Sequence, residues 1–256
     1  MIKFFRHIRK TLLMENKTSK YFKYAIGEIV LVVIGILIAL QINNWNETRK
    51  ENFRTLEYLR NIKEDLAADT LMCNIVLPKI KQTIENAKLV LNQRDFANMN
   101  ADSLFNRLPY FYFEYKVNTE TYNKILNAGL TALLTHKEIF NAITTYYTAD
   151  LELFNTRSAF DINHTAREVI LLESLNLERP IYMQNHAFLR EEFNYIQSEQ
   201  ERKENLIAFV TSVKGRNYLR DNLTRKILVH DAFSNVKENA NLLIQKIDKN
   251  LMEIND

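Results

Sequence analysis

The chain has 256 residues, of which 46% are hydrophobic and 25% are charged, so it holds enough apolar material for a folded core. Its formal net charge is +3, and its single cysteine, Cys73, excludes an internal disulfide and a zinc cluster of cysteines. Four glycines and three prolines are few for this length, which favours long helices over a turn-rich β fold.

Residues 1–23 form the first expected element, a basic arm. They contain seven Lys and Arg and one Glu, whereas the residues after Glu28 contain 27 basic and 29 acidic side chains. The basic excess is therefore local, and nothing in it indicates a nucleic-acid surface. In the run IKFFRHIRKTLL, apolar residues recur at helical spacing with bases between them, which is typical of an amphipathic helix on an anionic membrane leaflet.

Residues 24–44 are expected to cross a membrane once. The stretch AIGEIVLVVIGILIALQI has Glu28 as its only charge, and its eighteen residues make a helix of roughly 27 Å, close to the thickness of bilayer hydrocarbon. Aromatic residues suited to the two membrane interfaces flank it: Tyr21, Tyr24 and Trp45. The positive-inside rule then places the arm in the cytoplasm and residues 45–256 on the other side.

A cleaved signal peptide is the alternative for this region. It is disfavoured because the apolar run is longer than a signal-peptide core and begins late. The run is also followed by QINNWNE, which lacks a small-x-small cleavage site.

Small side chains recur every four residues along one face of the expected membrane helix. This face consists of Gly27, Leu31, Gly35 and Ala39, and such a face lets another helix approach closely. Glu28 points the same general way, where it either meets a partner or reaches the headgroups and nearby lysines. Two interpretations of the face stay open: self-association, or the ordinary abundance of Gly and Ala in membrane helices.

The run KYAIGEIVLVVIGILIALQINNWNE, with MIKFFRHIRKTLLMENKTSKYFKY before it, resembles the N-terminal signature of a family of uncharacterised single-pass inner-membrane proteins of Gram-negative bacteria. The likeness is close over residues 1–47 and looser through NTETYNKILNAGLTALL and HKEIFNAITTYY. It implies a bacterial inner-membrane anchor with a helical domain in the periplasm. It implies no catalytic or binding residue.

After the membrane segment, an apolar stripe at helical spacing predicts a further long helix. No Gly or Pro occurs between Gly35 and Pro78, and we expect Pro78 to kink or divide this helix. Asp102 is expected to cap a short helix that ends before Pro109.

Residues 110–115 then bring together an aromatic cluster of β-like composition: Tyr110, Phe111, Tyr112, Phe113 and Tyr115. Such a cluster either lines a ligand pocket or docks a partner, or it is core packing or an extended segment laid over a bundle. The sequence leaves these alternatives open.

The next segment, residues 119–127, is expected to be a short helix closed by Gly129. A capping box of Thr135 and Glu138 then predicts a long helical region, which DINHT at 161–165 interrupts and Pro180 ends.

A second capping box, Ser198 and Glu201, predicts another helix, which Gly215 closes. The last helix, from about residue 216 to residue 254, has apolar residues seven apart, as in the seam of a coiled coil or a bundle. Together these elements predict an all-α fold, with a single transmembrane helix continuing into an elongated antiparallel helical bundle at residues 45–256.

Motifs for chemistry are scarce. His164 stands with Asp161 and Glu168 at helical spacings that suit a metal, but the same residue types are common as ion pairs on exposed helices, so neither a metal site nor a cofactor is predicted. No GxSxG and no glycine-rich phosphate loop occurs in the sequence. We therefore expect no enzymatic activity.

The expected function is a membrane-anchored periplasmic interaction or scaffold protein, a subunit of a homo- or hetero-oligomeric envelope assembly. Its predicted partners are the anionic inner leaflet and a protein or a second copy of the chain, with no nucleic acid. The alternative is a periplasmic ligand-sensing module that signals through a membrane partner. An enzyme is the third and disfavoured possibility.

Overall fold

The computed structural model describes residues 14, 18–129, 137–181 and 194–255. It is 82% helical and has no strand within those ranges, which confirms the expected all-α fold. The chain divides into two compact units, Met1–Glu57 and Tyr58–Asp256. Most of the predicted basic arm lies outside the described residues, as does Thr135 of the expected capping box, and so do the surroundings of the Tyr21 side chain.

The first unit contains the beginning of helix α2, which spans Thr18–Asn92. Every residue from 29 to 45 is exposed, and an 18-residue window of the helix has a mean hydropathy of 2.6 with none of it buried. Among the helices of the described residues, α2 is the one long and apolar enough to cross a bilayer. Its length and composition are therefore compatible with a membrane anchor.

Pro78 does not divide α2, so that part of the expectation was wrong. A proline cannot donate a hydrogen bond to the carbonyl of the residue four positions earlier, here Asn74. Both residues are exposed, so water can reach the freed carbonyl. Val76 and Ile80, on the buried side of the same turn, are held in the core. The helix therefore continues through the proline.

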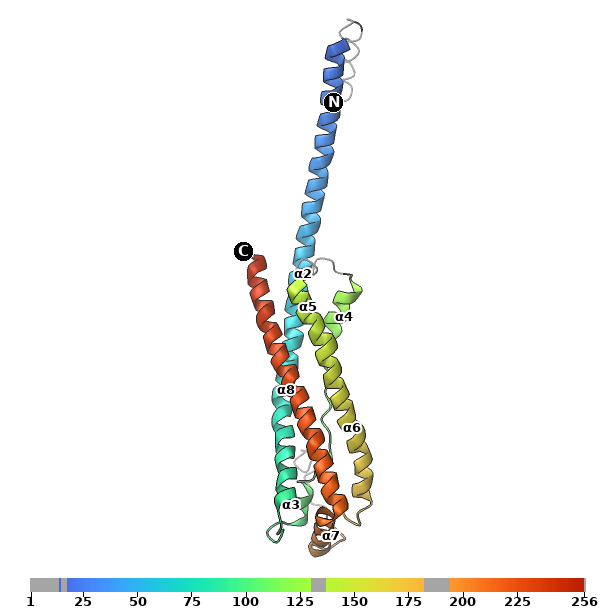
Figure 1. The fold of residues 1–256 in the computed structure, drawn as a ribbon, viewed down its shortest axis with the longest axis vertical. Helices are drawn as coiled ribbons and strands as arrows, with labels where there is room; N and C mark the ends of the chain where they lie inside the picture. The colour runs from blue at the N-terminus through green and yellow to red at the C-terminus, as the bar shows by residue number, and fades with distance from the viewer. Residues whose placement is uncertain (1–13, 15–17, 130–136, 182–193, 256) are drawn as a thin grey trace. The chain divides into compact units, whose positions relative to one another are not determined.

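Three long helices lie side by side in the second unit: α2 from residue 58 onward, α6 (Leu151–Glu173) and α8 (Val213–Asn255) (Figure 1). Helix α8 runs antiparallel to α2, because Lys63 Nζ lies 2.5 Å from Asp248 Oδ1 while Arg216 donates to the carbonyl of Leu91 at 2.8 Å. Helix α6 also opposes α8, so α2 and α6 run in the same direction.

Four shorter helices complete the unit. Two lie at one end of the bundle (Figure 1), α3 (Ala101–Phe105) and α7 (Glu199–Thr211). The other two are α4 (Glu120–Asn127) and α5 (Lys137–Thr145), and α5 leads directly toward α6. Asn100, rather than Asp102, caps α3, since its side chain accepts a hydrogen bond from the Ser103 amide at 2.7 Å. Gly129 has φ +57° just after α4, as expected for a helix end that needs a left-handed residue.

The expected interruption at DINHT was wrong. Helix α6 runs unbroken through residues 161–165, and Asp161 and Thr165 are buried. The irregularity lies earlier, at a π-helical turn labelled η2 (Tyr146–Asp150) between α5 and α6. A π turn holds one extra residue, which helps Tyr146 and its neighbour Tyr147 both to be buried.

Gly215 does not close a helix; it lies in the first turn of α8. Helix α7 ends at Thr211, and Ser212 starts the next helix by accepting a hydrogen bond from the Gly215 amide at 3.0 Å. A Cβ on Gly215 would lie 1.9 Å from the carbonyl oxygen of Phe209. Glycine is needed here because the two helices meet backbone to backbone.

Two hydrophobic clusters fill the second unit. The first joins α2 residues 59–84 to α8 residues 229–247, and the second joins Val90 and Leu172 to α3, α7 and the start of α8. The seven-residue seam predicted for α8 is confirmed, since six of its positions are at most 3% exposed: Val229, Phe233, Val236, Ala240, Leu243 and Ile247. Ile254 lies beyond the side chains that the structure describes.

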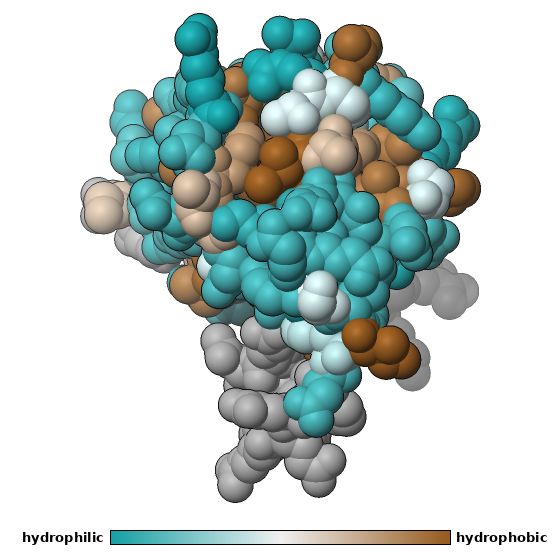
Figure 2. Space-filling view, turned by 90° about the horizontal axis from the view of Figure 1, so that it is seen from below, coloured by the Kyte–Doolittle hydropathy of each residue, from teal (hydrophilic) through white to brown (hydrophobic). Residues whose placement is uncertain are grey.

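A layer of buried polar groups stands between the two clusters on α6 and α8. Lys226 Nζ lies 2.6 Å from Asp161 Oδ2, and Glu168 pairs with Arg225 and accepts a hydrogen bond from Asn222 at 2.5 Å. Burial lowers the pKa of Lys226, and the carboxylate of Asp161 opposes that shift. Seen from the α3 and α7 end (Figure 2), hydrophilic residues cover most of the surface with hydrophobic ones between them.

Candidate functional site

Residues 106–119 join α3 to α4; we call this connection the strap. It begins with a turn at residues 106–108 and then has no regular secondary structure. Its side chains alternate in the way expected of extended backbone. Val117 is buried, and Phe113 and Tyr115 pack against the first hydrophobic cluster, whereas the even-numbered residues from 112 to 118 are exposed. Tyr110 packs against the second cluster, with its ring 4.9 Å from that of Phe105. The aromatic residues predicted as one cluster are therefore spread along the bundle.

A buried carboxylate on α2 holds the C-terminal part of the strap, at Tyr115 and Asn118. Asp69 is 0% exposed and accepts hydrogen bonds from the hydroxyls of Tyr115 at 2.5 Å and Tyr146 at 3.0 Å. The backbone amide of Asn118 donates to the same carboxylate at 3.4 Å, and the Asn118 side chain donates to Asp65 at 2.6 Å. These bonds tie the strap and the π turn to one point on α2.

Burial shifts the titration of this group of residues. It raises the pKa of Asp69 above its ordinary value, and the hydrogen bonds from the two tyrosines act in the opposite direction. Burial also raises the pKa of both tyrosine hydroxyls, with the Asp69 carboxylate adding to the effect, and it raises the pKa of Cys73 to about 11. Cys73 is therefore a buried thiol whose raised pKa disfavours the reactive thiolate.

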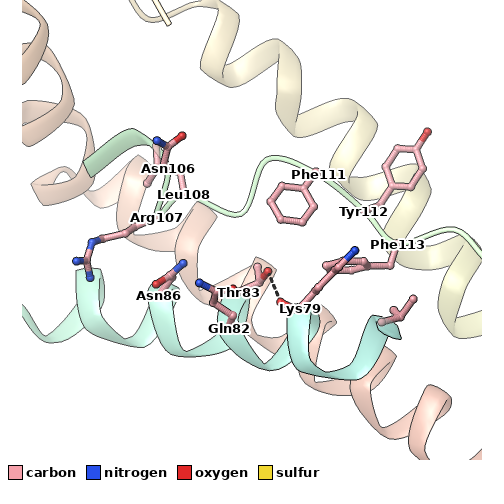
Figure 3. Close-up of a pocket in the computed structure, with 11 residues that line it drawn as sticks. Lys79, Gln82, Thr83, Asn86, Asn106, Arg107, Leu108, Phe111, Tyr112 and Phe113 are labelled. Atoms are coloured by element: carbon pink, nitrogen blue, oxygen red, sulfur yellow. Dashed lines mark hydrogen bonds between the residues drawn. The ribbon is translucent and has the colours of Figure 1, made fainter. Parts of the chain in front are cut away.

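A groove of about 400 Å³ lies between α2 and the N-terminal part of the strap, residues 106–113 (Figure 3). Its α2 wall is made of Val76, Lys79, Gln82, Thr83 and Asn86, and its strap wall of Asn106, Arg107, Leu108, Phe111, Tyr112 and Phe113. Small-molecule sites fall in this range of volumes and combine apolar walls with a few polar groups.

The polar groups of the groove are donors or amides, and among the described residues its lining includes no carboxylate. Within the described part of the chain, the side chains of Lys79, Gln82, Asn86, Asn106 and Arg107 have no hydrogen-bond or ion-pair partner. Thr83 donates its hydroxyl to the Lys79 carbonyl at 3.0 Å, so its lone pairs remain as acceptors. Lys79 and Arg107 thus bring two positive charges to the groove without a counter-ion among the described residues.

A comparison with protein families finds one match that covers more than half of the chain. The profile described as "Family of unknown function (DUF6090)" matches residues 28–160. The chain belongs to this family. No curated protein and no solved structure matches the chain.

The DUF6090 match includes the principal features of the candidate site. The apolar stretch of α2 from Glu28 onward, the whole groove lining, Asp69, Tyr115 and Tyr146 all lie within residues 28–160. Helices α7 and α8 lie outside the matched range. The residues of the candidate site in this DUF6090 member therefore all belong to the matched segment, residues 28–160, and α8 contributes to the hydrophobic core of the same unit.

The residues proposed for membrane-helix pairing lie on the exposed apolar stretch. A Cβ built on Gly27 or Gly35 meets nothing within 4 Å, so this face is open within the chain. Leu31 is 63% exposed, and Ala39 and the interfacial residues Tyr24 and Trp45 are exposed too. Glu28 is half-buried. The structure thus gathers these residues on one helix.

The candidate metal ligands His164, Asp161 and Glu168 do not share one environment. Asp161 and Glu168 face α8 and pair with Lys226 and Arg225, and neither is joined to the Arg167 beside them. The His164 ring instead lies 4.3 Å from that of Phe160. The two carboxylates are therefore engaged as ion pairs, which was the alternative to a metal site.

Sequence reasoning missed Asp69 and the groove. The available signal for Asp69 is an acidic residue in phase with apolar core positions, since Ile62, Leu66, Asp69 and Cys73 occupy one helical stripe. The groove had a weaker signal, because its strap wall is 20 or more residues away from Lys79 and Asn86 and its position depends on the tertiary fold.

Proposed function

We propose that the protein is a single-pass membrane protein whose helical domain is an interaction module in an oligomeric envelope assembly. The observation on which this proposal rests is that residues 29–45 of α2 are all exposed, while residues 29–40 among them are all apolar. A lipid environment or another membrane helix would cover such a surface, whereas water would not favour it. Farther along the same helix, residues 59–84 belong to the core of the bundle.

The proposed orientation places residues 1–23 in the bacterial cytoplasm and the helical domain in the periplasm. The support is the charge asymmetry: seven basic and one acidic side chain precede the apolar stretch, and the residues after it are nearly balanced. The anionic inner leaflet is the proposed lipid partner of the basic arm.

The proposed contact for assembly within the membrane is the face of Gly27, Leu31, Gly35 and Ala39. Small residues let two helices approach closely, and the open space around both glycines leaves room for a second helix. We propose a binding role rather than a catalytic one, because the buried carboxylates Asp69 and Asp161 already have partners within the bundle.

Extraction in a mild detergent, followed by cross-linking and mass spectrometry of co-purifying proteins, tests this proposal. The native chain should give a defined oligomer or a specific partner. Gly35→Phe should disrupt it without changing the fold of the monomer, since no described residue lies within 4 Å of a Cβ built at that position. Val33→Phe places the same ring on the opposite face and is the matched control.

A monomer without any partner, or equal assembly of the two variants, would contradict the proposed interaction. The orientation has its own test: a protease added to intact spheroplasts should digest the C-terminal domain. Protection of that domain would overturn the periplasmic assignment and leave the helix-pairing result unaffected.

A second candidate function, ligand sensing through a membrane partner, is favoured by the groove. Its volume of about 400 Å³ and its unpaired cations and amides are features of a binding site. Occupancy of the groove would act on the strap, which hydrogen-bonds to α2 at Asp69.

A further inference from the structure

The walls of the groove are held in place before any ligand arrives. At the N-terminal end of the strap, Leu108 is 1% exposed, and the hydroxyl of buried Tyr218 donates to the Pro109 carbonyl at 3.1 Å. At the C-terminal end of the strap, the Tyr115 hydroxyl and the Asn118 backbone amide donate to Asp69. A strap fixed at both ends loses little conformational entropy when a ligand binds.

The two cations of the groove stand at opposite ends of it. Figure 3 shows Lys79 beside Phe113, and Arg107 at the Asn86 end, with Gln82 and Thr83 between them along α2; the ring of Tyr112 is directed away from α2. Seven residues separate Lys79 from Asn86, which corresponds to about 10 Å of helix. The floor between these ends carries amides and a hydroxyl, and the opposite wall carries the ring of Phe111.

The excess of positive charge distinguishes this groove from a second hollow in the same unit. That hollow, of about 380 Å³, lies beside Leu77 and is lined by Lys237 and Glu238, so a carboxylate accompanies its cation. In the groove, none of the described lining residues is a carboxylate that would accompany Lys79 or Arg107. A ligand that supplies the missing negative charges is therefore favoured over a neutral or cationic one.

We propose that the groove binds an elongated organic dianion, with one acidic group at Lys79 and the other at Arg107. Arg107 suits a carboxylate or a phosphate, which its guanidinium binds through two parallel hydrogen bonds. The body of the ligand is flat and apolar, because Phe111 and Phe113 border the space between the two cations. This inference rests on the ligand-binding role given above as the second function.

Biphenyl-4,4′-dicarboxylate is a suitable probe, since it is a flat apolar rod with a carboxylate at each end. Its binding to the full chain in a mild non-ionic detergent is measured by isothermal titration calorimetry. Two analogues of the same shape, biphenyl-4,4′-dimethanol and biphenyl-4,4′-dimethanamine, separate the effect of charge from that of the apolar body. A detergent-only titration accounts for partition of the probes into micelles.

We expect saturable binding of the dicarboxylate that weakens as salt is added. Lys79→Gln and Arg107→Gln should each weaken it about 5- to 10-fold, and the dimethanol should bind at least about 10-fold more weakly than the dicarboxylate. Lys81→Gln is the matched control, because Lys81 is exposed on the same helix and does not line the groove. It should leave the affinity unchanged. Circular dichroism checks that each variant is folded.

Equal affinity of the dicarboxylate and the dimethanol, or an affinity that neither groove variant changes, would overturn the inference. Tighter binding of the dimethanamine would retain the ligand-binding role and refute the dianion. If none of the three probes binds saturably, both are refuted. None of these results bears on membrane anchoring or assembly, which the oligomer and spheroplast experiments test separately.

Discussion

Replacement of Asp69 by alanine is the most informative perturbation of the bundle. Asp69 is fully buried and connects three elements: its own helix α2, the strap through Tyr115, and the π turn through Tyr146. Asp69→Ala removes the acceptor of both hydroxyls while leaving the hydroxyls in place.

The magnitude follows from what each donor loses. Tyr146 is 3% exposed, so its hydroxyl has no water to replace the carboxylate, and Tyr115 is half-buried. A buried polar group left without a partner costs about 1–3 kcal/mol, so the two hydroxyls together cost about 2–5 kcal/mol of unfolding free energy. Asp69→Asn keeps the shape and one acceptor oxygen, and it should cost less than alanine.

The pH dependence follows from the raised pKa of Asp69. Because the folded chain holds this proton more tightly than the unfolded chain, the unfolded chain releases it first as the pH rises from about 4. The contribution of Asp69 to stability is therefore fully present below the unfolded pKa and declines as the pH rises through the folded pKa. The destabilisation caused by Asp69→Asn should accordingly be larger at the acid end of that window than at pH 7.

The assay is chemical unfolding of the full chain in mild detergent, followed by far-ultraviolet circular dichroism at several pH values. Glu64→Gln is the control, since it removes an exposed carboxylate five residues earlier on the same helix. A loss below about 1 kcal/mol for Asp69→Ala would refute the reasoning. So would a difference between wild type and Asp69→Asn that grows as the pH rises.

Two further substitutions test the packing of the bundle in the same unfolding assay. Gly215→Ala should lower the unfolding free energy by about 1–3 kcal/mol because its Cβ would collide with the Phe209 carbonyl, although this exchange inside a helix normally stabilises by about 0.5–1 kcal/mol. Gly27→Ala is the control, since no described residue lies within 4 Å of a Cβ at that position. A gain in unfolding free energy for Gly215→Ala would show that the close approach is absent. Lys226→Met should cost about 3–5 kcal/mol by leaving Asp161 without its ammonium partner, and adding Asp161→Leu should recover part of that loss. A double variant that is less stable than Lys226→Met would contradict the pairing.

Periodicity predicted the helices well wherever packing follows a regular stripe. The seam of α8 from Val229 to Ile247 and the stripe of α2 through Leu59, Ile62 and Leu66 are both in the core. Local capping chemistry also succeeded at Ser198, whose hydroxyl accepts from the Glu201 amide at 3.2 Å, and at Gly129. These features depend on residues within one or two turns of each other.

The predictions that were wrong concern residues whose role is set by distant parts of the chain. Pro78 and DINHT were treated as breakers from their local chemistry. Pro78 is on the exposed side of α2, and Asp161, the first residue of DINHT, is buried against the cations Arg225 and Lys226 of α8. Gly215 was interpreted as a helix end, whereas it allows α7 and α8 to meet. Charge pairing at Asp161 and backbone contact at Gly215 outweighed local preference, and Pro78 is tolerated because its side of the helix is exposed.

Only one wall of the candidate site could be recognised from the sequence. The aromatic run of the strap was noticed from its composition, and an extended segment laid over the bundle was among its interpretations. The other wall, with Lys79 and Asn86 on α2, has no distinctive local pattern, and only the fold brings it opposite Arg107.

The π turn at Tyr146–Asp150 bears on how relatives of this chain should be aligned. It contains one residue more than a regular turn, so core positions on either side of it are offset by one in sequence. Removing exposed Thr148 would leave a standard helix with the inner face of α6 still directed at α8, whereas a deletion within α6 would rotate everything after it by about 100°. Single-residue gaps among homologues should therefore gather at this turn.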